Sequence, residues 1–86
     1  MRHEKKAWPE LFQKVLDGKK TFDLRIADEV YQEGDILILQ EYDPKTKEYT
    51  GRNIEKKITY VLKTKDLAFW PKEEVEKYGY QILALQ

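Results

Sequence analysis

The segment DILILQEY, residues 35–42, constrains the fold of this chain more than any other stretch. Successive side chains of a strand point to opposite faces of a sheet, so its unbroken apolar run places apolar residues on both faces. Such a strand has to be covered on both sides, and we expect it to be central in its sheet or to line the interior of a barrel. A chain of 86 residues has room for one hydrophobic core of this kind, which predicts a single domain over residues 1–86.

A helix is predicted before this strand, in WPELFQKVLD at residues 8–17. Pro9 suits the first turn of a helix, and Gly18 suits the left-handed residue that ends one. The apolar residues between them recur at helical spacing and form one stripe, which we expect to face the core. They are Leu11, Phe12, Val15 and Leu16.

After Lys20 the hydrophobic period changes from that of a helix to that of a strand. One face of this strand should anchor it in the core, and the other should be polar. The residues on the first face are Phe22, Leu24 and Ile26. The residues on the second face are Thr21, Asp23 and Arg25.

The remaining sequence predicts further strands over residues 54–62 and 80–85, a long hairpin loop at 43–51 and a short helix at 71–77. Residues 2–6 are compatible with one more strand. This order fits an α+β domain, a small and mostly antiparallel β-barrel or pseudobarrel with one main N-terminal helix at its end.

Composition excludes several kinds of site and location. The chain has no cysteine and a single histidine, His3, so we expect neither disulfides nor a metal, and we predict no cofactor. The N-terminal segment MRHEKKAWPE has no apolar core like that of a secretory signal, and no apolar run approaches the length of a membrane span. We therefore expect a cytoplasmic protein that binds no membrane.

The net charge is zero, but it is composed of opposing blocks. Residues 1–25 carry a balance of +3, residues 26–43 carry −6 and residues 44–65 carry +5. The two basic blocks form a local positive patch if the fold brings them together, and otherwise the charges mix on a solvated surface. A strongly basic chain that binds phosphate without selectivity is excluded.

Three charged residues stand close together in GKKTFDLR, residues 18–25. Asp23 and Arg25 share one face of the predicted strand and can pair, and Lys20 lies at the start of that strand. Spacing alone leaves two readings open: the solvated face of an ordinary strand, or a preassembled polar site.

The same stretch resembles the G-x-K-x-x-E-x-R signature that follows a helix in ASCH domains of the PUA-like superfamily. It reads here as Gly18, Lys20, Asp23 and Arg25, with Asp where that family usually has Glu. His3, the Trp8–Pro9 pair and three flanking segments also resemble a small bacterial and phage branch of the family. These segments are GDILIL, EYDPKTKEYTG and ITYVL. The resemblance covers nearly the whole chain and implies a PUA-like fold.

The resemblance implies two alternative functions, and the charge pattern suggests a third. The first is a module that binds RNA or a modified nucleoside. The second is a small amidohydrolase that acts on an acylated cytidine, with Lys20 as nucleophile or electrostatic stabiliser, Asp23 as its partner, and a more distant glutamate. The glutamates available for that role are Glu73, Glu74 and Glu76. The third, suggested by charge alone, is a protein-interaction module that uses the acidic loop 27–35.

We expect the ligand or nucleic acid to meet seven residues, and we favour a monomer. The seven are Lys20, Asp23, Arg25, His3, Trp70, Lys56 and Lys57. Other basic side chains, among them Lys45 and Arg52, could add phosphate contacts. Among the aromatic residues we expect Trp8 and Phe22 to pack in the core, and Trp70 beside Pro71 to offer a surface on which a base can stack.

Overall fold

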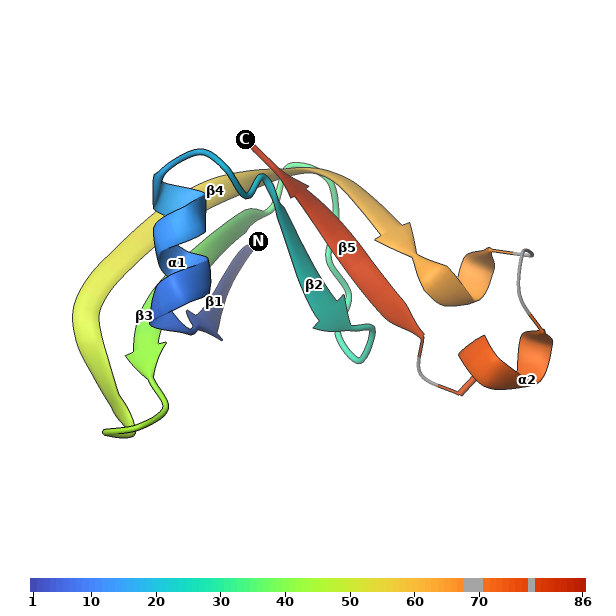
Figure 1. The fold of residues 1–86 in the computed structure, drawn as a ribbon. Helices are drawn as coiled ribbons and strands as arrows, with labels where there is room; N and C mark the ends of the chain where they lie inside the picture. Colours follow the sequence, from blue (N-terminus) through green and yellow to red (C-terminus); the bar gives the residue numbers. More distant parts are fainter. Residues whose placement is uncertain (68–70, 78) are drawn as a thin grey trace.

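The computed structural model describes residues 1–67, 71–77 and 79–86, and its strands form one mixed sheet (Figure 1). The elements are β1 (Arg2–Ala7), α1 (Pro9–Leu16), β2 (Phe22–Ile26), β3 (Ile36–Asp43), β4 (Glu48–Lys63), a short 3₁₀ helix η1 (Thr64–Asp66), α2 (Lys72–Val75) and β5 (Tyr80–Leu85). The strand order is β1-β3-β4-β5-β2. The α+β prediction with a main N-terminal helix is confirmed. The sheet is not closed, because β1 and β2 form its two edges, so a barrel is not confirmed.

β3 occupies the centre of its part of the sheet, as its sequence predicts. It pairs in parallel with β1 on one side and antiparallel with β4 on the other. Leu37, Ile38 and Leu39 are all buried, so apolar side chains on both faces of this strand are covered. The remaining pairings, of β4 with β5 and of β5 with β2, are antiparallel.

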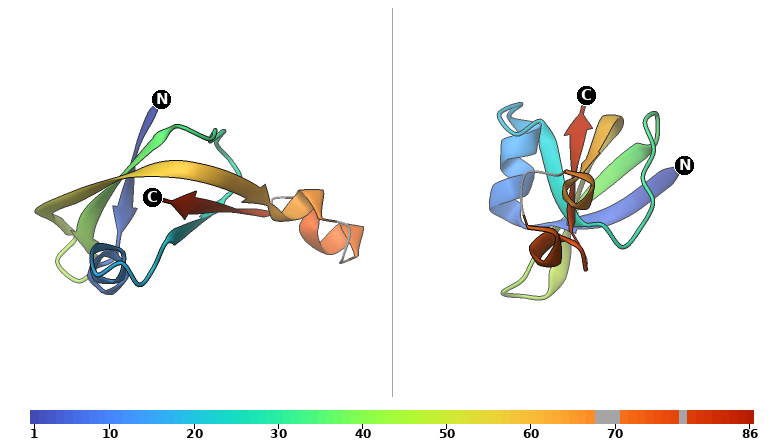
Figure 2. Two further views of the ribbon diagram at one scale, coloured as in Figure 1. Left: turned by 90° about the horizontal axis from the view of Figure 1, so that it is seen from above. Right: turned by 90° about the vertical axis from the view of Figure 1, so that its right-hand side faces the viewer.

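β4 is longer than the sequence predicts, because the turn before it is shorter. Lys47 adopts a left-handed φ of 58° and its amide donates to the carbonyl of Asp43, which closes a tight turn over residues 44–47. The first part of β4 pairs with β3 and the last part with β5, with a register shift between Ile58 and Tyr60. The strand therefore arches across the molecule and carries the sheet from α1 to α2 (Figure 2).

The core lies between α1 and the inner face of the sheet. Phe12 and Val15 of the helix are buried against this face, together with residues such as Leu37, Leu39 and Leu83. Leu11 and Leu16, which were predicted to share the buried stripe, are instead exposed. An eight-residue helix that docks on the sheet by one side brings only part of its stripe into the core.

The orientation of β2 corrects the sequence prediction. Phe22, Leu24 and Ile26, which were expected in the core, are 48%, 56% and 53% exposed. Asp23 is only 6% exposed, although it was placed on the polar, outward face. The pairing with β5 is the reason: Asp23 lies opposite Leu83, a fully buried residue, so both point inward.

Loop 27–35 is fastened to β1 by a buried histidine. The Nε2 atom of His3 lies 2.8 Å from the Asp35 carboxylate, and its Nδ1 atom lies 2.9 Å from Glu29. Its ring also contacts the ring of Tyr31, which belongs to the core. Glu29 accepts a second hydrogen bond from Lys5, and this bond is the main reason why the pKa of Glu29 is lowered.

Asp35 accepts the most hydrogen bonds of this network. Its hydrogen bond with His3, and then those with the N-terminal amine and the Gln32 amide, lower its pKa from 3.8 to about 2. A carboxyl group whose pKa is lowered by folding stabilises the folded state above its unfolded pKa and loses that contribution as the pH falls through its folded pKa. Asp35 therefore contributes to stability at neutral pH and ceases to do so between about pH 4 and pH 2.

No helix among the residues that the structure describes is long and apolar enough to cross a membrane.

We predict that Asp35→Asn lowers the free energy of unfolding at pH 7, because it removes the ionised partner of His3. The difference from the wild type should shrink as the pH falls from about 4 to about 2, where wild-type Asp35 becomes protonated. Urea unfolding followed by circular dichroism at a series of pH values measures this. Asp28→Asn, in the same loop but exposed, is the matched control and should change little. A constant difference across the whole pH range would contradict the assignment.

Candidate functional site

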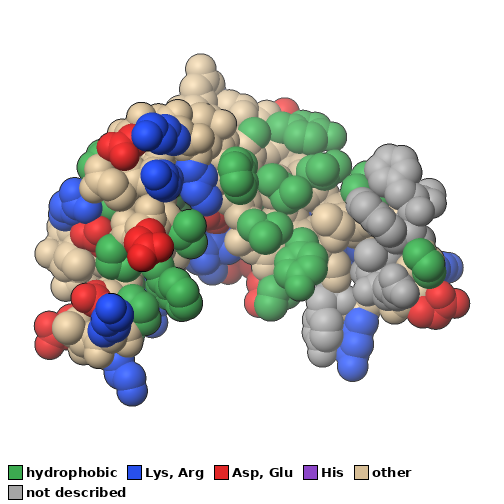
Figure 3. Space-filling model, viewed as in Figure 1, with side chains coloured by type: hydrophobic (Ala, Val, Ile, Leu, Met, Phe, Trp, Pro, Cys, Tyr) green, Lys and Arg blue, Asp and Glu red, His purple; other side chains and the backbone are tan. Residues whose placement is uncertain are grey.

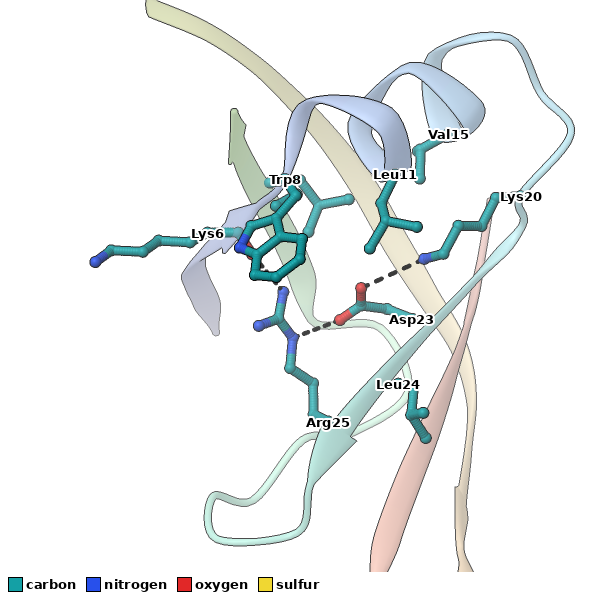
Figure 4. A pocket seen from close by; sticks show the side chains of 10 residues that line it. Lys6, Trp8, Leu11, Val15, Lys20, Asp23, Leu24 and Arg25 are labelled. Atoms are coloured by element: carbon teal, nitrogen blue, oxygen red, sulfur yellow. Dashed lines mark hydrogen bonds and ion pairs between the residues drawn. The ribbon is translucent and has the colours of Figure 1, made fainter. Parts of the chain in front are cut away.

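A cleft of about 280 Å³ lies between α1 and β2, close to the end of β1 (Figure 4). Its lining combines charged side chains with an apolar wall. The charged residues are Lys6, Lys20, Asp23 and Arg25. The apolar residues are Ala7, Trp8, Leu11, Val15, Leu24 and Leu39. The structure thus brings together Lys20, Asp23 and Arg25, three of the residues that the sequence singles out.

The Asp23 carboxylate is the centre of the polar wall. It is buried, and its two oxygens face two different cations. Arg25 donates from Nε to Oδ2 at 2.6 Å, and the Lys20 ammonium lies 3.7 Å from Oδ1. A buried carboxylate is tolerated when it is paired in this way, so the three side chains form one preassembled unit.

Arg25 also connects the two edges of the open sheet. While its Nε pairs with Asp23, its Nη2 donates to the backbone carbonyl of Lys6 on β1 at 3.1 Å. β2 and β1 make no strand pairing with each other, and this side chain spans the gap between them. The guanidinium is held in a fixed orientation with donors remaining for a ligand.

Lys20 is positioned by the end of α1. The chain turns at Gly18, which has a left-handed φ of 77°, and the Lys20 amide donates back to the carbonyl of Lys14 at 3.0 Å. Its ammonium then donates to the Phe22 carbonyl at 2.7 Å and faces Asp23. The side chain of Lys20 is only 16% exposed, and its exposed part lines the cleft.

The apolar wall comes from the start of α1, and the sequence analysis missed it. Trp8, which was expected in the core, is 60% exposed and lines the cleft with Leu11 (Figure 4). Trp8 is the N-cap residue of α1, and a cap lies outside the helical stripe that faces the core. Its place directly before Pro9 was the available signal, because proline favours the first helical turn and leaves the preceding residue at the cap.

A second groove, of about 570 Å³, continues from the cleft. Trp8 and Leu11 line both, so the indole stands between them. The far side of the groove is the turn between β3 and β4, with Pro44 and Lys45. A ligand seated in the cleft can therefore extend past Trp8 towards this turn.

The other predicted site residues lie elsewhere. His3 is buried beneath loop 27–35 and does not line the cleft. Lys56 and Lys57 lie on β4, where they pair with Leu37 and Ile36 of β3. Trp70 lies outside the described residues.

Arg52, a predicted phosphate contact, is occupied by an internal partner. Its Nε and Nη2 atoms each donate to the buried Glu41 carboxylate at 2.9 Å, and a further bond reaches Gln13 of α1. The same guanidinium, with Thr50, lowers the pKa of Glu41 from 4.5 to about 2. Arg52 fastens the β3–β4 hairpin to the helix.

The described part of the chain contains no group of three or more histidine, cysteine, aspartate or glutamate side chains with the arrangement of a metal site.

Comparison of the sequence with known proteins places the chain in a family. Residues 2–84 match the model of DUF3850, a domain of unknown function. The chain is also 40% identical, over 73 residues, to the "uncharacterized 12.9 kDa protein in GpA 3′ region" of Escherichia phage P2. That alignment covers 85% of this chain and 62% of the phage protein, so the chain spans less than two thirds of the length of its relative. The match over residues 2–84 is nearly complete, and the chain belongs to the DUF3850 family.

Proposed function

We propose that the chain is an ASCH-like module of the PUA-like type that binds a base of RNA, or a modified nucleoside, in the cleft between α1 and β2. The observation that carries the proposal is the fixed Lys20–Asp23–Arg25 unit facing an exposed tryptophan across one cleft. The class of ligand suggests that the module acts in the cytoplasm.

The polar wall offers more hydrogen-bond donors than acceptors. Lys20 and Arg25 together carry two positive charges against the single negative charge of Asp23. Both oxygens of Asp23 already face these cations, whereas the ammonium and the guanidinium have N–H groups left over. Such a wall suits the carbonyl edge of a base, or a phosphate oxygen, better than a cation.

The apolar wall suits the flat face of the same ligand. The exposed indole of Trp8 offers a stacking surface, and stacking on an aromatic side chain contributes about 1–3 kcal/mol per base. Arg25 and Lys20 line the same cleft as Trp8, so their donors are available to the edge of a base that stacks on the indole; Figure 4 shows how the three side chains lie. RNA-binding domains commonly combine stacking with edge recognition in this way.

The amidohydrolase alternative is less well supported. The Lys20 side chain donates to the Phe22 carbonyl and faces Asp23, so its nitrogen is held by internal partners, whereas a nucleophile has to be directed at the substrate. The glutamates expected to assist lie on or beside α2, at the opposite end of the molecule from α1 (Figure 1). Binding without turnover therefore agrees better with the geometry.

The protein-interaction alternative for loop 27–35 also loses support. Two of its acids, Glu29 and Asp35, pair internally with Lys5 and His3. Less negative charge is left to attract a basic partner than the sequence of the loop suggests.

We predict that Trp8→Ala weakens the binding of short single-stranded RNAs, or of the nucleoside that binds, by about 5- to 150-fold, because it removes one stacking contact. The side chain is exposed, so the melting temperature should hardly change. Amide shifts in an NMR titration with RNAs and a panel of nucleosides, including an acylated cytidine, measure the affinity. Val30→Ala, an exposed apolar residue of loop 27–35 that does not line the cleft, is the control and should bind as the wild type does. Unchanged affinity of Trp8→Ala would reject the cleft as the site.

We predict a shallow salt dependence for RNA binding. The charged residues of the cleft, Lys6, Lys20 and Arg25 against Asp23, leave two net positive charges, so at most one or two phosphates should be neutralised, with a slope of log K against log salt of about −0.7 to −1.4. Fluorescence anisotropy with labelled RNA at several salt concentrations measures this slope. A slope steeper than about −3 would indicate that the basic residues of β4 and its turn, rather than the cleft, bind the RNA.

A further inference from the structure

The outer face of β2, β5 and the end of β4 is apolar throughout the described residues. The outward side chains come from alternate positions of the three strands. They are Phe22, Leu24 and Ile26 on β2, Tyr80, Ile82 and Ala84 on β5, and Tyr60 and Leu62 on β4. We call these eight residues the outer apolar face. It appears as the largest group of hydrophobic side chains in the middle of Figure 3.

The side chains of this face remain open to water. Five of them are each about half exposed, namely Phe22, Leu24, Ile26, Tyr60 and Tyr80. The other three are partly exposed, namely Ile82, Leu62 and Ala84. An aromatic side chain has about 150–250 Å² of surface, so the three half-exposed aromatic residues expose about 300 Å², and Leu24 with Ile26 brings the exposed area to about 500 Å². That equals the largest apolar patch of a typical monomer, which is often a site of interaction.

The boundary of the face is sharp. Where β4 continues towards β3, its outward residues become Glu55 and Lys57, opposite Ile38 and Ile36. The patch is thus an apolar area with charges of both signs beside it, which is the usual composition of a protein interface with a polar rim. The hydroxyl groups of two tyrosines can remain at its margin in contact with water.

We propose that a second copy of this chain covers the outer apolar face, so that the protein forms a two-fold symmetric dimer through packing of the two sheets. The outer apolar face contains no charged residue, so its partner surface does not have to supply an opposite charge, and the same apolar face of a second copy can cover it. Two copies bury about 1,000 Å² in all, the area at which specific interfaces begin. The chain has no net charge, so no long-range repulsion opposes the approach of one copy to another.

The arrangement of the face fits a two-fold axis near its centre. Leu24 and Ile82 lie opposite each other in the register of β2 and β5, with Phe22 towards one end and Ile26 with Tyr80 towards the other. If the two-fold axis lies in the interface and crosses the strands at this central pair, the Phe22 end of one copy packs against the Ile26 end of its partner. Face-to-face sheets about 10 Å apart bury such side chains between them.

The dimer leaves the cleft accessible. Asp23 and Arg25 point to the inner face of β2, and Phe22, Leu24 and Ile26 point to the outer face. Leu24 borders both, so the second copy lies beside the mouth of the cleft without filling it. The proposed dimer differs from the monomer that the sequence analysis favours.

Sedimentation equilibrium of the full chain from about 5 to about 500 µM tests the proposal. We expect the mass to rise with concentration from one copy to two, because an interface near the lower size limit is weak. Ile26→Lys and, separately, Tyr60→Lys should remain monomeric at every concentration, since each places a charge on the face. Val30→Lys changes an exposed apolar residue of loop 27–35, outside the face, and should dimerise as the wild type does.

Two results would overturn the proposal: a wild-type mass of one copy at all concentrations, or dimers that persist in both face variants. A face covered by a different partner would give the first result. Dilution of the ¹⁵N-labelled wild type supplies a measurement that does not depend on variants. Amide shifts should move with concentration on the outward residues of β2, β4 and β5, and shifts confined to other surfaces would also reject the dimer.

Discussion

The buried carboxylate of Asp23 determines the shape of the cleft. An ionised group inside a protein has to be paired, and Asp23 meets this need with Arg25 and Lys20. The pairing directs Arg25 towards the carbonyl of Lys6 and so links β2 to β1, the two edges of a sheet that does not close. One ion-paired unit therefore both holds the walls of the cleft and supplies its donors.

This double role means that the polar wall cannot be changed without a cost to the fold. Breaking a buried ion pair by removing one partner costs about 3–5 kcal/mol, and small domains are stable by only about 5–15 kcal/mol. The pairs of Asp23 are partly open to solvent, which reduces that cost. Even so, loss of binding in an Arg25 variant would combine an altered site with a loosened edge. Trp8, exposed on the other wall, separates the two effects.

The sequence predicted the positions of the helices and strands well, but it predicted less well which side chains of each element point to the core. Helical and strand periods located α1, β2, β3 and β5, and the two-sided apolar run identified β3 as central. A period of two shows that charged and apolar residues of β2 alternate, but not which set points inward. That choice is made by pairing with β5, a strand more than fifty residues away. Contacts such as His3 with Asp35 depend on the same long-range arrangement, so the buried role of His3 could not be read from its position.

β2 reverses the usual order of a surface strand, and the reversal connects the two proposed interactions. Its charged residues face inward, where they are paired and where a cleft gives a ligand access to them. Its apolar residues consequently face outward, where exposure to water is unfavourable until another surface covers them. The register that directs the charged residues of β2 into the cleft thus also directs its apolar residues to the outer face. Since Leu24 borders both surfaces, packing on the outer face would hold β2 in place and so help to fix the donors on its inner face.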